Sequence, residues 1–168
     1  MNINDVVLIT GASKGLGLAL AREVARRGNR LILNARGADA LNRVAAELNA
    51  MAIAGDVSEV AEEIAVKAGR VDVLINNASE LGPSPMPALL DHSWESLLHI
   101  FRVNVVAPLH LAQLLRPKLI VNITSDAGVN AYAGWGGYGS SKAALEHASR
   151  VLAAEGSRVL VVDPGDMN

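Results

Sequence analysis

The sequence predicts an α/β fold in which helices cover both faces of an open, doubly wound parallel sheet. Strand-like and helix-like stretches alternate along all 168 residues, as they do in chains of βαβ units. The predicted strands are continuous apolar runs, so both of their faces should be buried, as in a parallel sheet. Right-handed crossovers then favour a Rossmann-type sheet with the strand order 3-2-1-4-5-6.

Short runs rich in Val, Ile and Leu mark the strands. In chain order they are residues 6–10, 30–36, 50–54, 71–76, 118–124 and 158–163. Between them, apolar residues recur at helical spacing, for example Leu16, Leu20 and Val24, which predicts amphipathic helices. These helices are residues 15–27, 38–48, 59–67, 91–115 and 138–155. Pro108 should kink or break the longest of them, because proline cannot donate to the helical ladder.

Composition excludes several classes of protein. The chain is 51% hydrophobic and 19% charged, which excludes a disordered chain. A net charge of −2 gives no reason to expect nucleic acid or an anionic membrane as a partner. The chain has no cysteine, and its four histidines show no ligand spacing, so no metal site is expected. We see no signal peptide and no apolar run near the ~20 residues of a membrane span, and expect one cytoplasmic domain over residues 1–168.

A glycine-rich turn joins the first predicted strand to the first helix. Its sequence is TGASKGLG, residues 10–17. Glycines permit a sharp turn and the close approach of a phosphate, and a helix N-terminus favours an anion. The spacing of Gly11, Gly15 and Gly17 matches neither the G-x-G-x-x-G fingerprint nor the P-loop. Nucleotide binding is therefore favoured, with a plain strand-to-helix turn as the alternative.

Two cations lie at the positions that contact the adenosine ribose in dinucleotide-binding folds. Arg36 ends the second predicted strand, and Lys14 lies inside the glycine-rich turn. An acid at the end of that strand would accept a hydrogen bond from the 2′-hydroxyl of NAD, whereas an arginine pairs with the 2′-phosphate of NADP. The two cations favour NADP(H), against the alternative of two solvated surface charges.

Four polar residues in the second half of the chain suit carbonyl chemistry. Tyr138 and Lys142 are four apart and so share one face of a helix. A carbonyl that accepts hydride needs a proton, and a tyrosine that supplies it near neutral pH needs its pKa of about 10 lowered by about 3. A neighbouring ammonium favours that change. Ser125 follows a strand and can hold the carbonyl oxygen, and Asn104 lies in the long helix.

In this order, these pieces resemble the short-chain dehydrogenase/reductase family. The matching segments are TGASKGLG (10–17), Asp56-Val57, NNAS (76–79), Asn104, Ser125, YGSSK (138–142) and DPG (163–165). The resemblance covers essentially the whole chain. It implies an NADP(H)-dependent oxidoreductase that transfers hydride between the nicotinamide and a small-molecule carbonyl or alcohol.

The resemblance also assigns roles. Tyr138 would be the general acid/base, Lys142 would lower its pKa and hold the nicotinamide ribose, Ser125 would orient the carbonyl, and Asn104 would hold a proton-relay water. The implied cofactor contacts are Gly11, Ser13, Gly15 and Gly17 at the phosphates, Leu16 in the same turn, Arg36 with Lys14 at the 2′-phosphate, Asp56 and Val57 at adenine, Asn76 and Ala78 on the adenosine side, and Pro164 and Gly165 near the nicotinamide. Family members usually associate through the helices that correspond to residues 91–115 and 138–155, which implies a homodimer or homotetramer.

The chain departs from the family pattern in three ways. Ser79 replaces the last glycine of the NNAG-type motif, residues 56–76 are compressed, and the sequence ends at Asn168. The family continues there with a substrate loop, a helix and a seventh strand, so we expect this chain to lack that region. The alternatives are a non-catalytic NADP(H)-binding or scaffold protein, and an epimerase or dehydratase, which usually needs a larger substrate domain.

Overall fold

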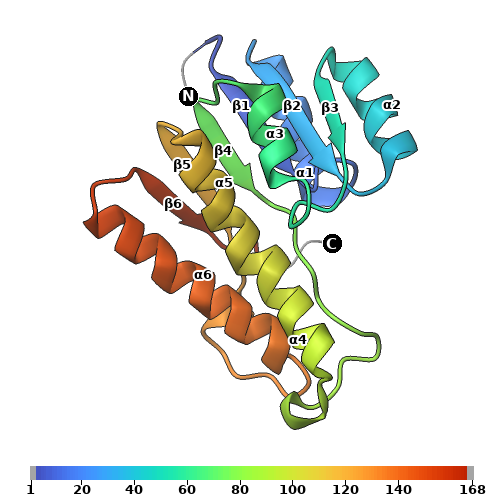
Figure 1. The fold of residues 1–168 in the computed structure, drawn as a ribbon, viewed down its shortest axis with the longest axis vertical. Helices are drawn as coiled ribbons and strands as arrows, with labels where there is room; N and C mark the ends of the chain where they lie inside the picture. Colours follow the sequence, from blue (N-terminus) through green and yellow to red (C-terminus); the bar gives the residue numbers. More distant parts are fainter. Residues whose placement is uncertain (1–2, 166–168) are drawn as a thin grey trace.

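A six-stranded parallel sheet forms the centre of the computed structural model, which describes residues 3–165 (Figure 1). Its order is β3-β2-β1-β4-β5-β6, and every adjacent pair is parallel. The strands are β1 (Val6–Thr10), β2 (Arg30–Ala35), β3 (Met51–Ala54), β4 (Val73–Asn76), β5 (Leu119–Ile123) and β6 (Val159–Val162). The predicted strand order is therefore confirmed.

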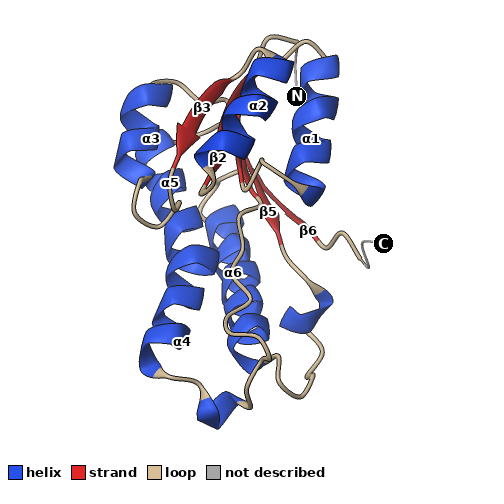
Figure 2. Ribbon diagram, turned by 90° about the vertical axis from the view of Figure 1, so that its right-hand side faces the viewer, coloured by secondary structure: helices blue, strands red, loops and turns tan. Residues whose placement is uncertain are grey.

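Helices cover both faces of this sheet (Figure 2). They are α1 (Gly15–Arg26), α2 (Ala38–Leu48), α3 (Ala61–Ala68), α4 (Trp94–Phe101), α5 (Ala107–Leu115) and α6 (Gly136–Ala154). Val7 and Ile9 of β1 pack against α1 and α2, whereas Leu8 packs against α3 and α5. Successive residues of one strand thus enter two separate cores, which explains why the strands read as unbroken apolar runs.

Two helix predictions need correction. The helix predicted at residues 59–67 begins two residues later, because the N–H groups of Glu59 and Val60 bond to the Asp56 carbonyl in a turn. Pro108 does not break the long helix. Instead, a π-helical segment (Arg102–Val106) joins α4 to α5, and the N–H of Ala107 bonds back to the Arg102 carbonyl, five residues earlier. Such segments are frequent at functional sites.

The continuous helix Trp94–Leu115 is long and apolar enough, at 22 residues and a mean hydropathy of 1.3, to cross a membrane by length and composition alone. A helix packed on a sheet passes the same test. Its buried residues, among them Ile100 and Leu111, form the apolar stripe that faces the core. Trp94, Leu98 and Val106 of the same helix are exposed.

Candidate active site

A cleft of about 500 Å³ lies at the carboxyl ends of β1, β2 and β4. In a parallel sheet this edge is where ligands bind. Most of the residues predicted to bind a cofactor line the cleft, namely Gly11, Ser13, Lys14, Gly15, Leu16, Gly17, Arg36, Asp56, Val57 and Ala78. Sequence reasoning did not select Asn34, Asn77, Ser79 and Glu80, which line it as well.

Two glycines of the turn are required for different structural reasons. A Cβ on Gly17 would lie 2.2 Å from the Gly11 carbonyl oxygen, so glycine there lets α1 begin directly against β1. Gly15 has a φ of +54°, and a Cβ added to it would meet nothing within 4 Å. The chain is therefore open toward the cleft beside the first N–H groups of α1, where the helix dipole favours an anion. These donors fit a pyrophosphate.

Thr10 and Asn77 fix the floor of the cleft. The Thr10 hydroxyl accepts the N–H groups of Asn77 (3.1 Å) and Ala78 (3.0 Å). The Asn77 amide donates in return to the carbonyls of Thr10 (3.0 Å) and Gly11 (3.2 Å). The turn after β1 and the turn after β4 are thus tied together. Asn77 stands next to the predicted Asn76, and a single sequence does not show which of two adjacent amides faces the cleft.

A second asparagine, Asn34, holds the wall of the cleft that includes Asp56. Asn34 is buried at the end of β2, and its amide donates to the carbonyls of Ile53 (3.0 Å) and Gly55 (3.1 Å). This holds the segment that leads into Asp56. Burial raises the pKa of Asp56, but hydrogen bonds from the hydroxyl and N–H of Ser58, together with electrostatic contributions of His99 and Arg36, lower it, so the net shift is downward and favours the carboxylate. The signal in the sequence was an amide inside an otherwise apolar strand.

Arg36 does not stand alone in the cleft. Its Nη1 lies 3.1 Å from Oε2 of Glu80, and Nε2 of His99 lies 3.7 Å from the same oxygen. The sequence predicts only positive charges, Arg36 and Lys14, in this part of the cleft. That prediction is incomplete, because the Glu80 carboxylate, from the segment after β4, lies there as well. The sequence placed Glu80 directly after the NNAS motif but gave no reason to pair it with Arg36.

The Asn104 side chain is fully occupied by protein partners. Its Oδ1 accepts the Glu80 N–H (2.7 Å), and its Nδ2 donates to the Glu80 carbonyl (2.8 Å) and to the Ser141 hydroxyl (2.9 Å). The amide clamps the segment after β4 to α6. The side chain has no group left for the proton-relay water that the sequence predicts at Asn104. The backbone carbonyl of Asn104 is a different case, because Pro108, four residues on, has no N–H to donate to it.

Tyr138 and Ser125 meet because α6 packs tightly against the turn after β5. A Cβ on Gly139 would lie 2.4 Å from the Ala127 carbonyl oxygen, so the glycine of the YGSSK motif permits this contact. Burial raises the pKa of Tyr138, and hydrogen bonds with the hydroxyls of Ser125 and Ser79 only partly offset that rise. The lowered pKa that the sequence predicts is not present in the protein alone.

Lys142 lies behind the tyrosine ring. Its Nζ is 5.5 Å from the centre of the Tyr138 ring and donates to the Ile123 carbonyl at 2.9 Å. The residue is only 2% exposed, and burial lowers the pKa of its ammonium to about 8. A buried cation beside a half-buried phenol, with the pKa of the cation shifted by burial, is typical of reactive sites.

Seven predicted residues do not line the cleft: the four catalytic candidates Asn104, Ser125, Tyr138 and Lys142, and also Asn76, Pro164 and Gly165. Asn76 is buried and donates to the Asn122 side chain of β5 at 2.7 Å, so it links strands. Pro164 and Gly165 follow β6 at the same edge of the sheet, but they do not line the cleft. The Gly165 N–H bonds locally to the Asp163 carboxylate at 3.0 Å.

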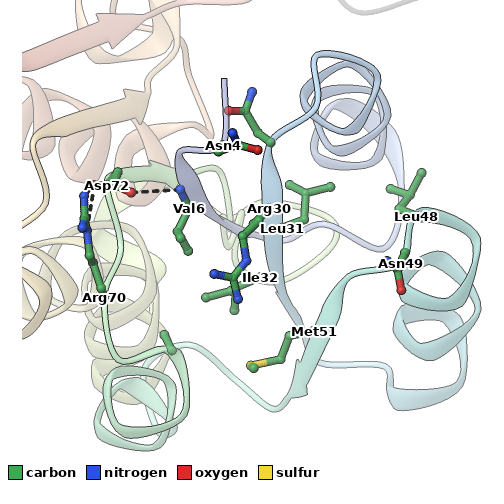
Figure 3. A pocket seen from close by; sticks show the side chains of 12 residues that line it. Asn4, Val6, Arg30, Leu31, Ile32, Leu48, Asn49, Met51, Arg70 and Asp72 are labelled. Atoms are coloured by element: carbon green, nitrogen blue, oxygen red, sulfur yellow. Dashed lines mark hydrogen bonds and ion pairs between the residues drawn. The ribbon is translucent and has the colours of Figure 1, made fainter. Parts of the chain in front are cut away.

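A second hollow, of about 660 Å³, lies at the opposite, amino edge of the sheet (Figure 3). Arg30, Arg70 and Asp72 are among its lining residues. Asp72 is buried and accepts the Val6 N–H at 3.0 Å, Arg70 Nη2 at 2.7 Å and Lys118 Nζ at 3.0 Å. No predicted site residue lines this hollow, and the contacts of Asp72 join elements of the fold.

Comparison with known proteins adds independent evidence. Residues 5–168 match a family model described as short chain dehydrogenase. An NADPH-dependent pterin aldehyde reductase from Arabidopsis thaliana is 35% identical over 182 aligned positions, which cover 96% of this chain and 74% of the relative. Because that alignment is longer than the chain itself, the relative carries residues that this chain lacks.

Solved structures agree in fold. A short-chain dehydrogenase from Streptomyces avermitilis has a TM-score of 0.87 and 34% identity, over 98% of this chain and 66% of that one. A short-chain dehydrogenase from Shigella flexneri, complexed with NADP, has a TM-score of 0.83 and 28% identity, over 96% of this chain and 77% of that one. This chain thus spans between two thirds and about three quarters of these relatives.

Proposed function

Because the chain belongs to the short-chain dehydrogenase family, a family of oxidoreductases, we propose that it is an NADP(H)-dependent enzyme that interconverts a carbonyl compound and an alcohol. The observation that carries this proposal is the placement of Tyr138 near Ser125, with the Lys142 ammonium 5.5 Å from the centre of its ring, at the same sheet edge as the glycine-lined cleft. A relative that is NADPH-dependent and a similar structure that holds NADP support the choice of cofactor.

The residues of the cleft fit the adenosine half and the pyrophosphate of the cofactor. The N–H groups at the start of α1 would hold the pyrophosphate, and Arg36 with Lys14 would pair with the 2′-phosphate. Asp56 and Val57 would border adenine. When bound, the cofactor supplies the hydride and, once oxidised, a positive charge near the phenol.

The chain's own residues would manage the proton. In the reducing direction, the Ser125 hydroxyl orients the carbonyl oxygen and Tyr138 donates its phenolic proton to that oxygen. The carbonyl becomes an alcohol, and Tyr138 is left as a phenolate. Its raised pKa opposes that charge, so the Lys142 ammonium and the oxidised cofactor have to stabilise it. The proton is then restored from solvent through Lys142 and a water on the Asn104 carbonyl.

Replacing Tyr138 by Phe tests this assignment. The phenylalanine ring would keep the packing but has no proton to donate, so we expect turnover to fall by about 10²–10⁴-fold with NADPH affinity retained. Turnover is measured as NADPH consumption with a panel of aldehydes and ketones. The control is Ser157→Ala, which removes a hydroxyl from an exposed residue beyond the far end of α6 and should change turnover little.

Two results would contradict the proposal. Undiminished turnover by Tyr138→Phe would remove Tyr138 from the role of general acid. NADPH binding by the wild type without turnover of any carbonyl in the panel would favour the alternative, a non-catalytic NADP(H)-binding protein.

A further inference from the structure

The corner of the cleft that would receive the adenosine ribose holds both a cation and an anion. Arg36 follows β2 and Glu80 follows β4, and these strands flank β1 on its two sides. Their ion pair, 3.1 Å between Nη1 and Oε2, therefore spans the carboxyl end of β1. Both residues line the cleft.

Glu80 is the more firmly fixed of the two. Its N–H and carbonyl are both bound by the Asn104 amide, at 2.7 and 2.8 Å, and its Oε1 accepts the Gly82 N–H at 3.1 Å. The Glu80 side chain is 18% exposed, against 66% for Arg36. The Glu80 carboxylate is thus held in place at this corner, whereas the Arg36 side chain is long and largely exposed to solvent.

The two charges favour different cofactors. An arginine pairs with the 2′-phosphate of NADP, and a carboxylate accepts from the 2′-hydroxyl of NAD. The end of β2 carries no acid, since its residues are Ala35, Arg36 and Gly37. Glu80 places a carboxylate at the same corner from another part of the chain.

We infer that Glu80 is a specificity-determining residue that limits the preference for NADP(H) over NAD(H) conferred by Arg36 and Lys14. The inference rests on the proposed use of a nicotinamide cofactor. A 2′-phosphate has to displace Glu80 from Arg36 and then lies close to a like charge, which weakens its binding. Binding of a 2′-hydroxyl requires neither the displacement of Glu80 nor the approach of two like charges. The wild type should therefore bind NADH in addition to NADPH.

The test is the ratio of the dissociation constants of NADH and NADPH, measured by calorimetry at low salt for the wild type and for Glu80→Gln. The Gln side chain keeps an oxygen for the Gly82 N–H but loses the charge. We expect the variant to raise the ratio about fivefold, the scale of one exposed ion pair, mainly through tighter NADPH binding. The gain should shrink at high salt, which screens exposed charges.

Two further variants complete the test. Arg36→Gln should change the ratio in the opposite direction. Glu63→Gln removes a carboxylate of equal charge from an exposed pair with Lys67 on α3, outside the cleft, and should leave the ratio unchanged.

An unchanged ratio in Glu80→Gln, or equal weakening of both cofactors, would overturn the inference and leave the proposed function intact. Failure of the wild type to bind either dinucleotide would instead contradict the proposed function itself.

Discussion

The two edges of the sheet carry buried charges that differ in how they are compensated. Asp72 at the amino edge is 3% exposed and Lys142 at the carboxyl edge is 2% exposed. The Val6 N–H and two cations hold the pKa of Asp72 well below its usual range, so its charge is stabilised. Burial lowers the pKa of Lys142 to about 8, so its charge is destabilised. The larger of the two hollows lies beside Asp72, whose charge is stabilised. The volume of a hollow and the presence of a buried charge are therefore not enough to identify a cofactor site.

The largest effect expected concerns Lys142. Its pKa is lower in the folded chain than in the unfolded one, so the unfolded state binds the extra proton between about pH 8 and 10.5, and stability rises with pH across that window. Relative to Lys142→Met, the wild-type free energy of unfolding should increase by about 3 kcal/mol from pH 7 to pH 10.5. Urea unfolding at a series of pH values measures this. A constant difference between the two proteins would show that the ammonium is not destabilised.

Asp72→Asn tests whether the stabilised charge at the amino edge contributes to folding and not to cofactor binding. The lowered pKa of Asp72 means that its contribution is present above its unfolded pKa of 3.8 and is lost as pH falls below it. We expect the variant to lose about 2 kcal/mol of stability at pH 7, with the difference shrinking below about pH 4. NADPH affinity should not change. A variant with wild-type stability and weakened NADPH binding would refute the structural role of this edge.

Gly139→Ala should have the smallest effect on stability. The added methyl meets the Ala127 carbonyl oxygen, at an overpacking cost of about 1–3 kcal/mol, which the better helix propensity of alanine offsets by about 1. We expect a net loss of about 1 kcal/mol and a fall in turnover of about tenfold, because the turn that carries Ser125 moves away from Tyr138. Ser140→Ala, at the exposed neighbouring position, is the control. Equal turnover in the two variants would mean that the tight contact does not position the pair.

The sequence predicted the fold well because the signals are local. Strand order followed from apolar runs and from the handedness of crossovers, and the glycine-rich turn placed the cleft. The prediction of the long helix was less accurate. Pro108 indicated a disturbance, but a π-helical segment just before it absorbs that disturbance, and packing on the sheet keeps the helix continuous.

The site was predicted less completely, because its details depend on contacts between residues distant in the chain. Asn76 and Asn77 differ only in which way each side chain turns, and the hydroxyl of Thr10, 67 residues away, settles the position of Asn77. The ion pair of Arg36 with Glu80 joins residues 44 apart. The direction of the Tyr138 pKa depends on burial, which a motif does not report.

Hydrogen–deuterium exchange with and without NADPH tests the difference between the two edges most directly. We predict protection of residues 11–17, 34–37, 55–57 and 77–80, and none at the amino-edge residues 29–32, 48–51 and 68–72. Protection centred on the amino-edge hollow, or no protection at the carboxyl edge at saturating NADPH, would contradict the assignment of the cofactor site to the carboxyl edge.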